Sequence, residues 1–198
     1  MGYSIDPISA NCYRDTTVLI NKFDIRDEDK LSEIESVISS ARYAEWLNEP
    51  LCSTFDFTHY KSIHHFLFSD LYDWAGQVRT VNISKKGTQF VPAENIENQA
   101  MMIFKRLHAC NYFKGLSRNE FITELVDFYC TTNMLHPFRE GNGRTQRVFL
   151  TQLIRNAGYE LNFADMDTEL LMIATIQSAQ GVTALLTRIF TDSLSRWA

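Results

Sequence analysis

The sequence predicts a mainly α-helical protein, a bundle of about seven helices with one small β-hairpin. Apolar residues recur at intervals of three and four over most of the chain, as on the buried faces of helices. One stretch, residues 77–91, instead alternates apolar and polar residues, which is typical of strands. The 198 residues contain no repeat, linker or charge block. We therefore expect a single domain over residues 1–198.

The helices of the first half are predicted from their apolar positions. The first follows Asp27 and would bury one face, made of Leu31, Ile34, Val37, Ile38, Ala41 and Ala44. The second follows Thr58, the expected N-cap, and would bury Tyr60, Ile63, Leu67, Leu71 and Trp74. The third follows Pro92, which a first helical turn tolerates, and would bury Ile96, Ala100, Ile103 and Leu107.

The second half starts with a capping box, in which Ser117 and Glu120 predict the beginning of a fourth helix. Behind it, the apolar positions are Phe121, Leu125 and Phe128 or Tyr129. Three further helices are expected over about 142–156, 167–179 and 182–196. Gly158 and Gly181 would end the first two of these, because glycine is favoured just past a helix end.

The predicted hairpin turns at Lys85, Lys86, Gly87 and Thr88. Its alternation indicates an edge strand. An exposed edge can pair with an extended peptide and hold it without reading much of its sequence. This stretch is therefore a candidate docking site for a protein segment.

Composition excludes several classes of protein. Hydrophobic residues make up 45% and charged residues 22%, which argues against intrinsic disorder. The net charge of -5 favours neither direct nucleic-acid binding nor attraction to an anionic membrane. No apolar run approaches the ~20 residues that span a bilayer, and the N-terminus lacks the pattern of a secretory signal. The four cysteines show no CxxC spacing, so we expect a cytoplasmic protein without a disulfide framework.

Residues 136–147 differ from the rest of the chain. Pro137 disfavours helical geometry at His136, so the chain must leave the preceding helix there. Gly141 and Gly143 allow backbone angles that other residues avoid and let a ligand approach the main chain. A glycine-flanked loop that enters a helix presents free N–H groups at the positive end of the helix dipole. This arrangement predicts a phosphate site.

Charged side chains around this loop extend the prediction. Arg144 and Arg147 are three residues apart and can hold further phosphate oxygens. Glu140 is a hard oxygen ligand, and a carboxylate beside a bound di- or triphosphate suggests Mg²⁺. His136 can accept a proton near neutral pH. Together these residues indicate a phosphoryl- or nucleotidyl-transfer site.

Other phosphate and metal motifs are missing from the sequence. No GxxxxGK[ST] segment is present, which excludes a P-loop. Residues 141–146 lack the last glycine of GxGxxG and no strand precedes them, which excludes a Rossmann site. HExxH is absent, and the other histidines have no spacing that suggests zinc.

The segment from His136 to Arg147 matches every position of HxFx[DE]GNGRxxR, the signature of the Fic family (filamentation induced by cyclic AMP). Residues 71–79 and Phe90 also resemble the Fic segment that leads into a flap hairpin. Residues 17–25 resemble the toxin members, which are paired with a small antitoxin. The resemblance covers nearly the whole chain and implies the Fic fold, a helical bundle with a β-hairpin flap.

The resemblance implies transfer of AMP from ATP to a hydroxyl group of a target protein. His136 would be the base that deprotonates the hydroxyl, and Glu140 would bind Mg²⁺ between the α- and β-phosphates. Phe138 would anchor the loop in the core. Lys85, Lys86, Gly87 and Thr88 would form the flap that docks the target.

The other motif residues are implied to bind the phosphates of ATP. Asn142 would shape the anion nest, and Gly141 and Gly143 would leave room for it. Arg144 is expected on the β-phosphate and Arg147 on the γ-phosphate. Doc-type kinases have a lysine in place of Gly143 and bind the nucleotide reversed, so glycine favours AMP transfer over phosphorylation.

Two alternatives to AMP transfer stay open: a Doc-like protein kinase, and a partner-binding module with vestigial catalysis. The inhibitory pattern [ST]xxxE[GN] of many Fic proteins is absent. This suggests that a small antitoxin supplies the inhibitory glutamate in trans, directed at Arg147. The expected targets are the type II topoisomerase subunits of DNA gyrase or topoisomerase IV. Translocation is expected only if the chain is part of a longer secreted effector.

Overall fold

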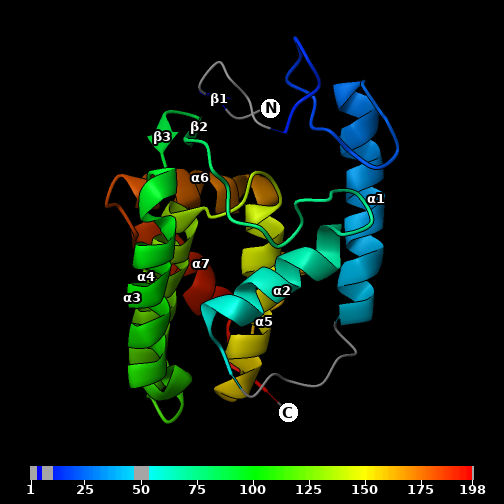
Figure 1. Cartoon of the computed structure of the whole chain (residues 1–198). Coiled ribbons are helices and arrows are strands. Elements are labelled where there is room, and N and C mark those ends of the chain that lie inside the picture. The colour runs from blue at the N-terminus through cyan, green and yellow to red at the C-terminus, as the bar shows by residue number, and fades with distance from the viewer. Residues whose placement is uncertain (1–3, 6–10, 47–53, 198) are drawn as a thin grey trace.

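The structure is a computed structural model that describes residues 4–5, 11–46 and 54–197 (Figure 1). Within these residues it contains seven α-helices: α1 (Glu28–Trp46), α2 (Phe57–Phe68), α3 (Ile96–Ala109), α4 (Arg118–Leu135), α5 (Asn142–Asn156), α6 (Thr168–Ala179) and α7 (Ala184–Ser193). The prediction of a mainly α-helical bundle is confirmed. Figure 1 shows α1 on one side of the molecule and α3 and α4 on the other, with α2 and α5 between them.

Helix ends follow the capping chemistry. The capping box of Ser117 and Glu120 begins α4 as predicted. The predicted N-cap of α2 is wrong: Asp56, not Thr58, accepts a 2.7 Å hydrogen bond from the His59 backbone N–H. A carboxylate two residues earlier has the right spacing to the free N–H groups. Gly158 has a φ of 85° just past α5, as expected of a glycine that ends a helix.

Two helices are shorter than predicted. Helix α2 ends at Phe68, so Leu71 is buried outside the helix. Helix α7 ends at Ser193 because the next residues form strand β5 (Ser195–Arg196), which pairs antiparallel with β4 (Tyr159–Glu160). Backbone pairing with a distant strand overrode the helical pattern there.

The predicted hairpin is present as β2 (Ile83–Lys85) and β3 (Thr88–Gln89). Lys86 and Gly87 both have positive φ, 49° and 79°, as a two-residue hairpin turn requires. Strand β1 (Ser4–Ile5) pairs antiparallel with the other side of β2. The sheet order β1-β2-β3 therefore leaves β3, not β2, as an outer strand on the flap.

An aromatic cluster around Phe149 fixes α5 in the core. The ring of Phe149 lies 5.3–5.8 Å, between ring centroids, from the rings of Tyr60, Phe55, Phe104 and Phe128. These side chains are buried and come from α2, α3, α4 and the segment before α2. Because close-packed rings tolerate little displacement, the position of α5 is set by three neighbouring helices.

Helix α1 does not bury its predicted face. Val37 is 70% exposed, and Ile34, Ala41 and Ala44 are exposed as well. The buried residues are Leu31, Glu35 and Ser39, which are spaced by four and share one line along the helix. The inner face of α1 is therefore partly polar, and Glu35 and Ser39 on this face contact Arg144 of α5.

No helix in the described part of the chain is long and apolar enough to cross a bilayer. Cys12, Cys110 and Cys130 are free thiols. Cys52 lies outside the described residues.

Candidate active site

The predicted site lies at the connection between α4 and α5. His136 caps the end of α4 in the left-handed conformation, with φ 41° and ψ 58°. The following Pro137 prevents α4 from continuing. A left-handed residue other than glycine costs on the order of 1–2 kcal/mol, so surrounding contacts must hold His136 in place.

Arg79 supplies several of those contacts. Its side chain is 5% exposed, and its Nε donates to the His136 carbonyl at 2.8 Å. Its two Nη atoms donate to the carbonyls of Val81 at 2.7 Å and Val91 at 2.5 Å. The Arg79 backbone N–H also donates to the Pro137 carbonyl at 2.9 Å. One guanidinium thus ties the loop to both ends of the flap, a role that the sequence pattern alone did not indicate.

Asn142 closes the loop. Its Oδ1 accepts from the Phe138 N–H at 2.8 Å, and its Nδ2 donates to the Phe138 carbonyl at 2.8 Å. Phe138 is fully buried and stacks on His64, with ring centroids 3.8 Å apart. The structure therefore places Phe138 in the core and Asn142 at the centre of the loop.

His64 was not predicted to take part in the site. The Gly76 backbone N–H donates to its Nδ1 at 2.7 Å, so Nε2 carries the proton and donates to the Glu140 carbonyl at 3.0 Å. Burial lowers the pKa of His64 to about 3, which keeps the ring neutral. The buried ring holds the loop at Glu140.

The two loop glycines differ. Gly141 has a φ of 78°, and a Cβ there would lie 2.4 Å from the ring of Phe68. Gly143 lies inside α5, so the expectation of an unusual backbone angle is wrong for it. A Cβ at Gly143 would lie 3.3 Å from Nη1 of Arg147, so this glycine leaves room beside that guanidinium.

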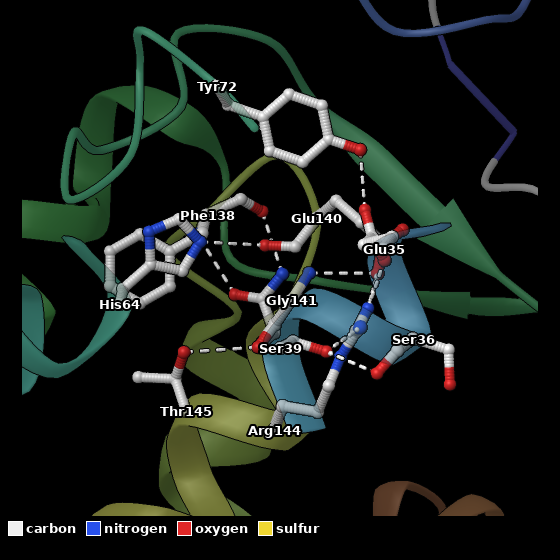
Figure 2. A network of polar contacts seen from close by, with 11 residues as sticks. Glu35, Ser36, Ser39, His64, Tyr72, Phe138, Glu140, Gly141, Arg144 and Thr145 are labelled. Atoms are coloured by element: carbon white, nitrogen blue, oxygen red, sulfur yellow. Dashed lines mark hydrogen bonds and ion pairs between the residues drawn. The ribbon is translucent and has the colours of Figure 1, made fainter. Parts of the chain in front are cut away.

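Arg144 points toward α1 (Figure 2). Its Nη2 forms an ion pair with Oε1 of Glu35, and its Nη1 donates to Oγ of Ser39 at 2.8 Å. Its guanidinium lies over the ring of Phe68, 4.9 Å from the centroid. Glu140 Oε1 is 3.8 Å from Nη2. The sequence does not indicate Glu35 or Ser39 as site residues, because the apolar positions of their helix predict that another face is buried.

The His136 imidazole is oriented from two sides. Its Nδ1 is 3.0 Å from the Asn133 carbonyl, which can only accept, so Nδ1 carries the proton and Nε2 is the unprotonated ring nitrogen. Phe90 of the flap stacks on the ring, with centroids 3.7 Å apart and planes 13° apart. Burial lowers the pKa of His136 to about 3, and the charges of Lys85 and Arg79 add to this. The imidazole is therefore neutral at neutral pH.

These residues face one cavity of about 780 Å³, a volume typical of small-ligand sites. The predicted residues that line it are His136, Glu140, Gly141, Gly143, Arg144, Arg147, Lys85, Lys86 and Thr88. Asn142 and Phe138 support the loop from behind, and Gly87 sits in the flap turn. Apolar residues of α6, including Leu171 and Ile176, line another part. Lys86 Nζ lies 2.7 Å from Met172 Sδ, so the flap tip contacts α6 beside the cavity.

Glu140 is the candidate metal ligand. Its Oε1 accepts from the Gly141 N–H at 2.8 Å. Burial raises the pKa of Glu140, and the nearby carboxylate of Glu35 raises it further. The described residues contain no group of three or more His, Cys, Asp or Glu side chains that could hold a metal. A hard cation at Glu140 would need oxygens from a ligand or water, which suits Mg²⁺ beside phosphates.

Comparison with known proteins agrees with this geometry. The Fic/DOC family model matches residues 54–154, a range that contains the whole loop. The chain belongs to the Fic/DOC family. It is 38% identical over 177 residues to the probable protein adenylyltransferase y4lH of Sinorhizobium fredii, covering 89% of each chain.

A second relative is the protein adenylyltransferase VbhT of Bartonella schoenbuchensis. It is 35% identical over 183 residues, which is 92% of this Fic chain but only 38% of VbhT. Among solved structures, BepC of Bartonella tribocorum with bound AMPPNP has a TM-score of 0.88 at 28% identity, covering 95% of this chain and 97% of that one. A Fic domain from Bartonella quintana with bound ADP has the same TM-score and identity, covering 94% of each chain. The predicted Fic fold is therefore confirmed.

The two glycines provide a matched pair of variants. Gly141→Ala should lose about 3 kcal/mol or more of unfolding free energy, because the added methyl meets the Phe68 ring at a left-handed residue. Gly143→Ala should change stability by less than about 1 kcal/mol, because alanine suits a helix and Arg147 can shift. Urea denaturation followed by circular dichroism measures both. Equal losses would contradict the assigned backbone geometry.

Stability should also fall on acidification. The folded protein keeps His64 and His136 neutral to about pH 3, whereas the unfolded chain protonates them near pH 6.5. Their contribution is therefore present above about pH 6.5 and is lost as the pH falls toward 3, by up to about 1.4 kcal/mol per pH unit for each ring. Urea denaturation at about pH 7.5 and about pH 5.5 measures this loss.

His136→Gln removes one of the two titrating rings, so this variant should lose less stability over the same pH range. The exposed His108→Gln variant is the matched control and should behave like the wild type. A His136→Gln variant with the full pH dependence of the wild type would show that His136 is not buried as a neutral ring.

Proposed function

We propose that this protein is a protein adenylyltransferase, which transfers AMP from ATP to a hydroxyl side chain of a target protein. One observation carries the proposal: the neutral imidazole of His136 shares a cavity with a helix N-terminus and two arginines. A base and an anion site within one cavity are what nucleotidyl transfer requires. The names of the relatives and the nucleotides bound in the similar structures support the same activity.

In this mechanism, Nε2 of His136 takes the proton of the target hydroxyl. The hydroxyl oxygen attacks the α-phosphorus of ATP and forms the new P–O bond. The bond between the α-phosphorus and its bridging oxygen breaks, and pyrophosphate leaves. The hydrogen bond from Nδ1 to Asn133 and the stacked Phe90 keep the ring oriented for this proton transfer.

The phosphate groups would lie at the N-terminus of α5. Gly141 caps this helix, and Asn142 and Gly143 begin it. The first backbone N–H groups of a helix have no partner within the helix and can bind anions. Arg144 and Arg147 would hold the β- and γ-phosphates. Glu140 would hold Mg²⁺ together with phosphate oxygens, and the bound ion would neutralise developing negative charge.

The flap would present the target. With β1 paired to β2, an extended target segment would add to the outer edge of β3, which includes Thr88. Lys85 and Lys86 line the cavity from the flap. Backbone pairing would place the target hydroxyl near His136 with little dependence on its sequence.

The structure favours AMP transfer over the Doc-like kinase alternative at one position. A side chain at Gly143 would crowd Nη1 of Arg147, since its Cβ alone would lie 3.3 Å away. Glycine leaves Arg147 free to meet a terminal phosphate. The vestigial binding module is disfavoured because the imidazole, the carboxylate and both arginines all face the cavity.

The proposal extends to a cytoplasmic toxin that acts on type II topoisomerase subunits and is inhibited by a small antitoxin. The support is the missing inhibitory pattern in the sequence together with Arg147, which lines the cavity and which a glutamate from another chain could reach. Burial lowers the pKa of Arg147, because the charged guanidinium is partly removed from water. A partner carboxylate beside it would offset part of this free-energy cost.

The catalytic role of His136 is tested with labelled ATP. Wild-type chain, Mg²⁺ and bacterial lysate should give labelled protein from α-labelled ATP, and His136→Ala should lower the rate by about 10²–10⁴-fold. Autoradiography measures the label, and mass spectrometry identifies the modified protein and residue. Label that persists at the wild-type rate in His136→Ala would reject His136 as the base.

The same assay with γ-labelled ATP distinguishes the kinase. No protein label is expected, because the γ-phosphate leaves with pyrophosphate. Label from γ-labelled but not α-labelled ATP would instead establish phosphorylation.

The antitoxin proposal predicts that the isolated chain is active without any partner. The readout is the labelling rate of the isolated chain with and without the Arg147→Ala substitution. The substitution should lower this rate, because Arg147 is proposed to hold a phosphate of ATP and no inhibitory glutamate has to be displaced from it. An isolated chain that is inactive, and that becomes active when Arg147 is replaced, would contradict inhibition in trans.

A further inference from the structure

Glu35 is a buried carboxylate that the mechanism above does not use. It lies on α1, is 7% exposed, and is 109 residues before Arg144 in the sequence. Its Oε2 accepts a 2.5 Å hydrogen bond from the Tyr72 hydroxyl. Its Oε1 pairs with Nη2 of Arg144. A carboxylate this deeply buried is kept only where its charge is compensated, and Arg144 provides the compensating charge.

The same stretch of α1 gives Arg144 a second contact. Ser39, one turn after Glu35, accepts from Nη1 at 2.8 Å. The two contacts engage both terminal nitrogens of the guanidinium from one side (Figure 2). The ring of Phe68 covers one face of the guanidinium. An arginine held at three points loses the rotamer freedom that would otherwise oppose ligand binding.

These contacts leave the guanidinium available to a ligand. Arginine has five N–H donors, and Glu35 and Ser39 engage two of them. The side chain of Arg144 is 29% exposed and lines the cavity. Glu35 lies on the buried face of α1 and is held in place by its hydrogen bond with Tyr72. It is not among the residues that line the cavity. It therefore orients Arg144 without occupying the space of a phosphate.

We propose that Glu35 is a positioning residue, which holds the guanidinium of Arg144 in place for the nucleotide phosphates. The inference rests on the proposed nucleotide site. It assigns α1 a part in phosphate binding, although α1 lies outside the signature loop and outside the residues 54–154 matched by the family model.

The test compares binding of ADP and adenosine by isothermal titration calorimetry. Glu35→Ala should weaken ADP binding about tenfold or more, because truncating one partner of a buried charge pair disturbs the other. Adenosine binding should stay unchanged, because adenosine carries no phosphate. Glu33→Ala, an exposed glutamate on the same helix, is the matched control and should bind both ligands like the wild type.

Arg144→Ala and the double variant Glu35→Ala/Arg144→Ala complete the cycle. If Glu35 acts through Arg144, the double variant should bind ADP no more weakly than Arg144→Ala alone. Glu35→Gln keeps the shape of the side chain, and Ser39→Ala removes the other contact. Both should show a smaller loss of ADP affinity, and they carry the test if Glu35→Ala does not fold.

Each other outcome overturns the inference. ADP binding by Glu35→Ala at or above wild-type affinity would show that Glu35 does not position Arg144 or that it competes with phosphate. Equal losses for ADP and adenosine would show a purely structural role. A wild-type chain that binds adenosine but not ADP would overturn the proposed nucleotide site as well, whereas wild-type ADP binding with an unaffected Glu35→Ala variant overturns the inference alone.

Discussion

The paired hydrogen bonds between the Asn142 amide and the backbone of Phe138 are the constraint on which the site depends. They close the loop so that Phe138 points into the core and the start of α5 faces the cavity. The aromatic contacts of Phe149 hold α5, and those of His64 hold Phe138. The loop proposed to bind phosphate is thus built on buried, closely packed rings, where little reorganisation is needed when a ligand binds.

Around this loop, the fold sets charge states through burial. His64 and His136 are both neutral because their rings are removed from water, yet they serve different ends. His64 has both ring nitrogens engaged with backbone groups and supports the loop. His136 lines the cavity, its Nδ1 is held by Asn133, and its unprotonated Nε2 is the nitrogen that the proposed mechanism uses. The distinction lies in the hydrogen-bond partners and in access to the cavity, since both residues are buried histidines.

Helix α1 shows how tertiary contacts override a local pattern. Its apolar positions predicted a face with Val37, but the buried line contains Glu35 and Ser39. Glu35 forms an ion pair with Arg144 and accepts a hydrogen bond from Tyr72, and these contacts offset the cost of removing its carboxylate from water. Neither partner is near α1 in the sequence, so no window along the chain could indicate the contact. The same holds for the hydrogen bond from Arg79 to the His136 carbonyl, which joins residues 57 positions apart.

Local patterns along the chain were enough to predict the class of fold, the capping box of α4, the bounds of α5, the hairpin turn and the loop residues from His136 to Arg147. These follow from local rules: apolar periodicity, capping, turn chemistry and a contiguous signature. The three-dimensional structure was needed to find the buried face of α1, the end of α7, the hydrogen bond from Arg79 to the His136 carbonyl and the partners of Arg144. These depend on groups that meet across long stretches of chain, where packing and charge compensation outweigh local preference.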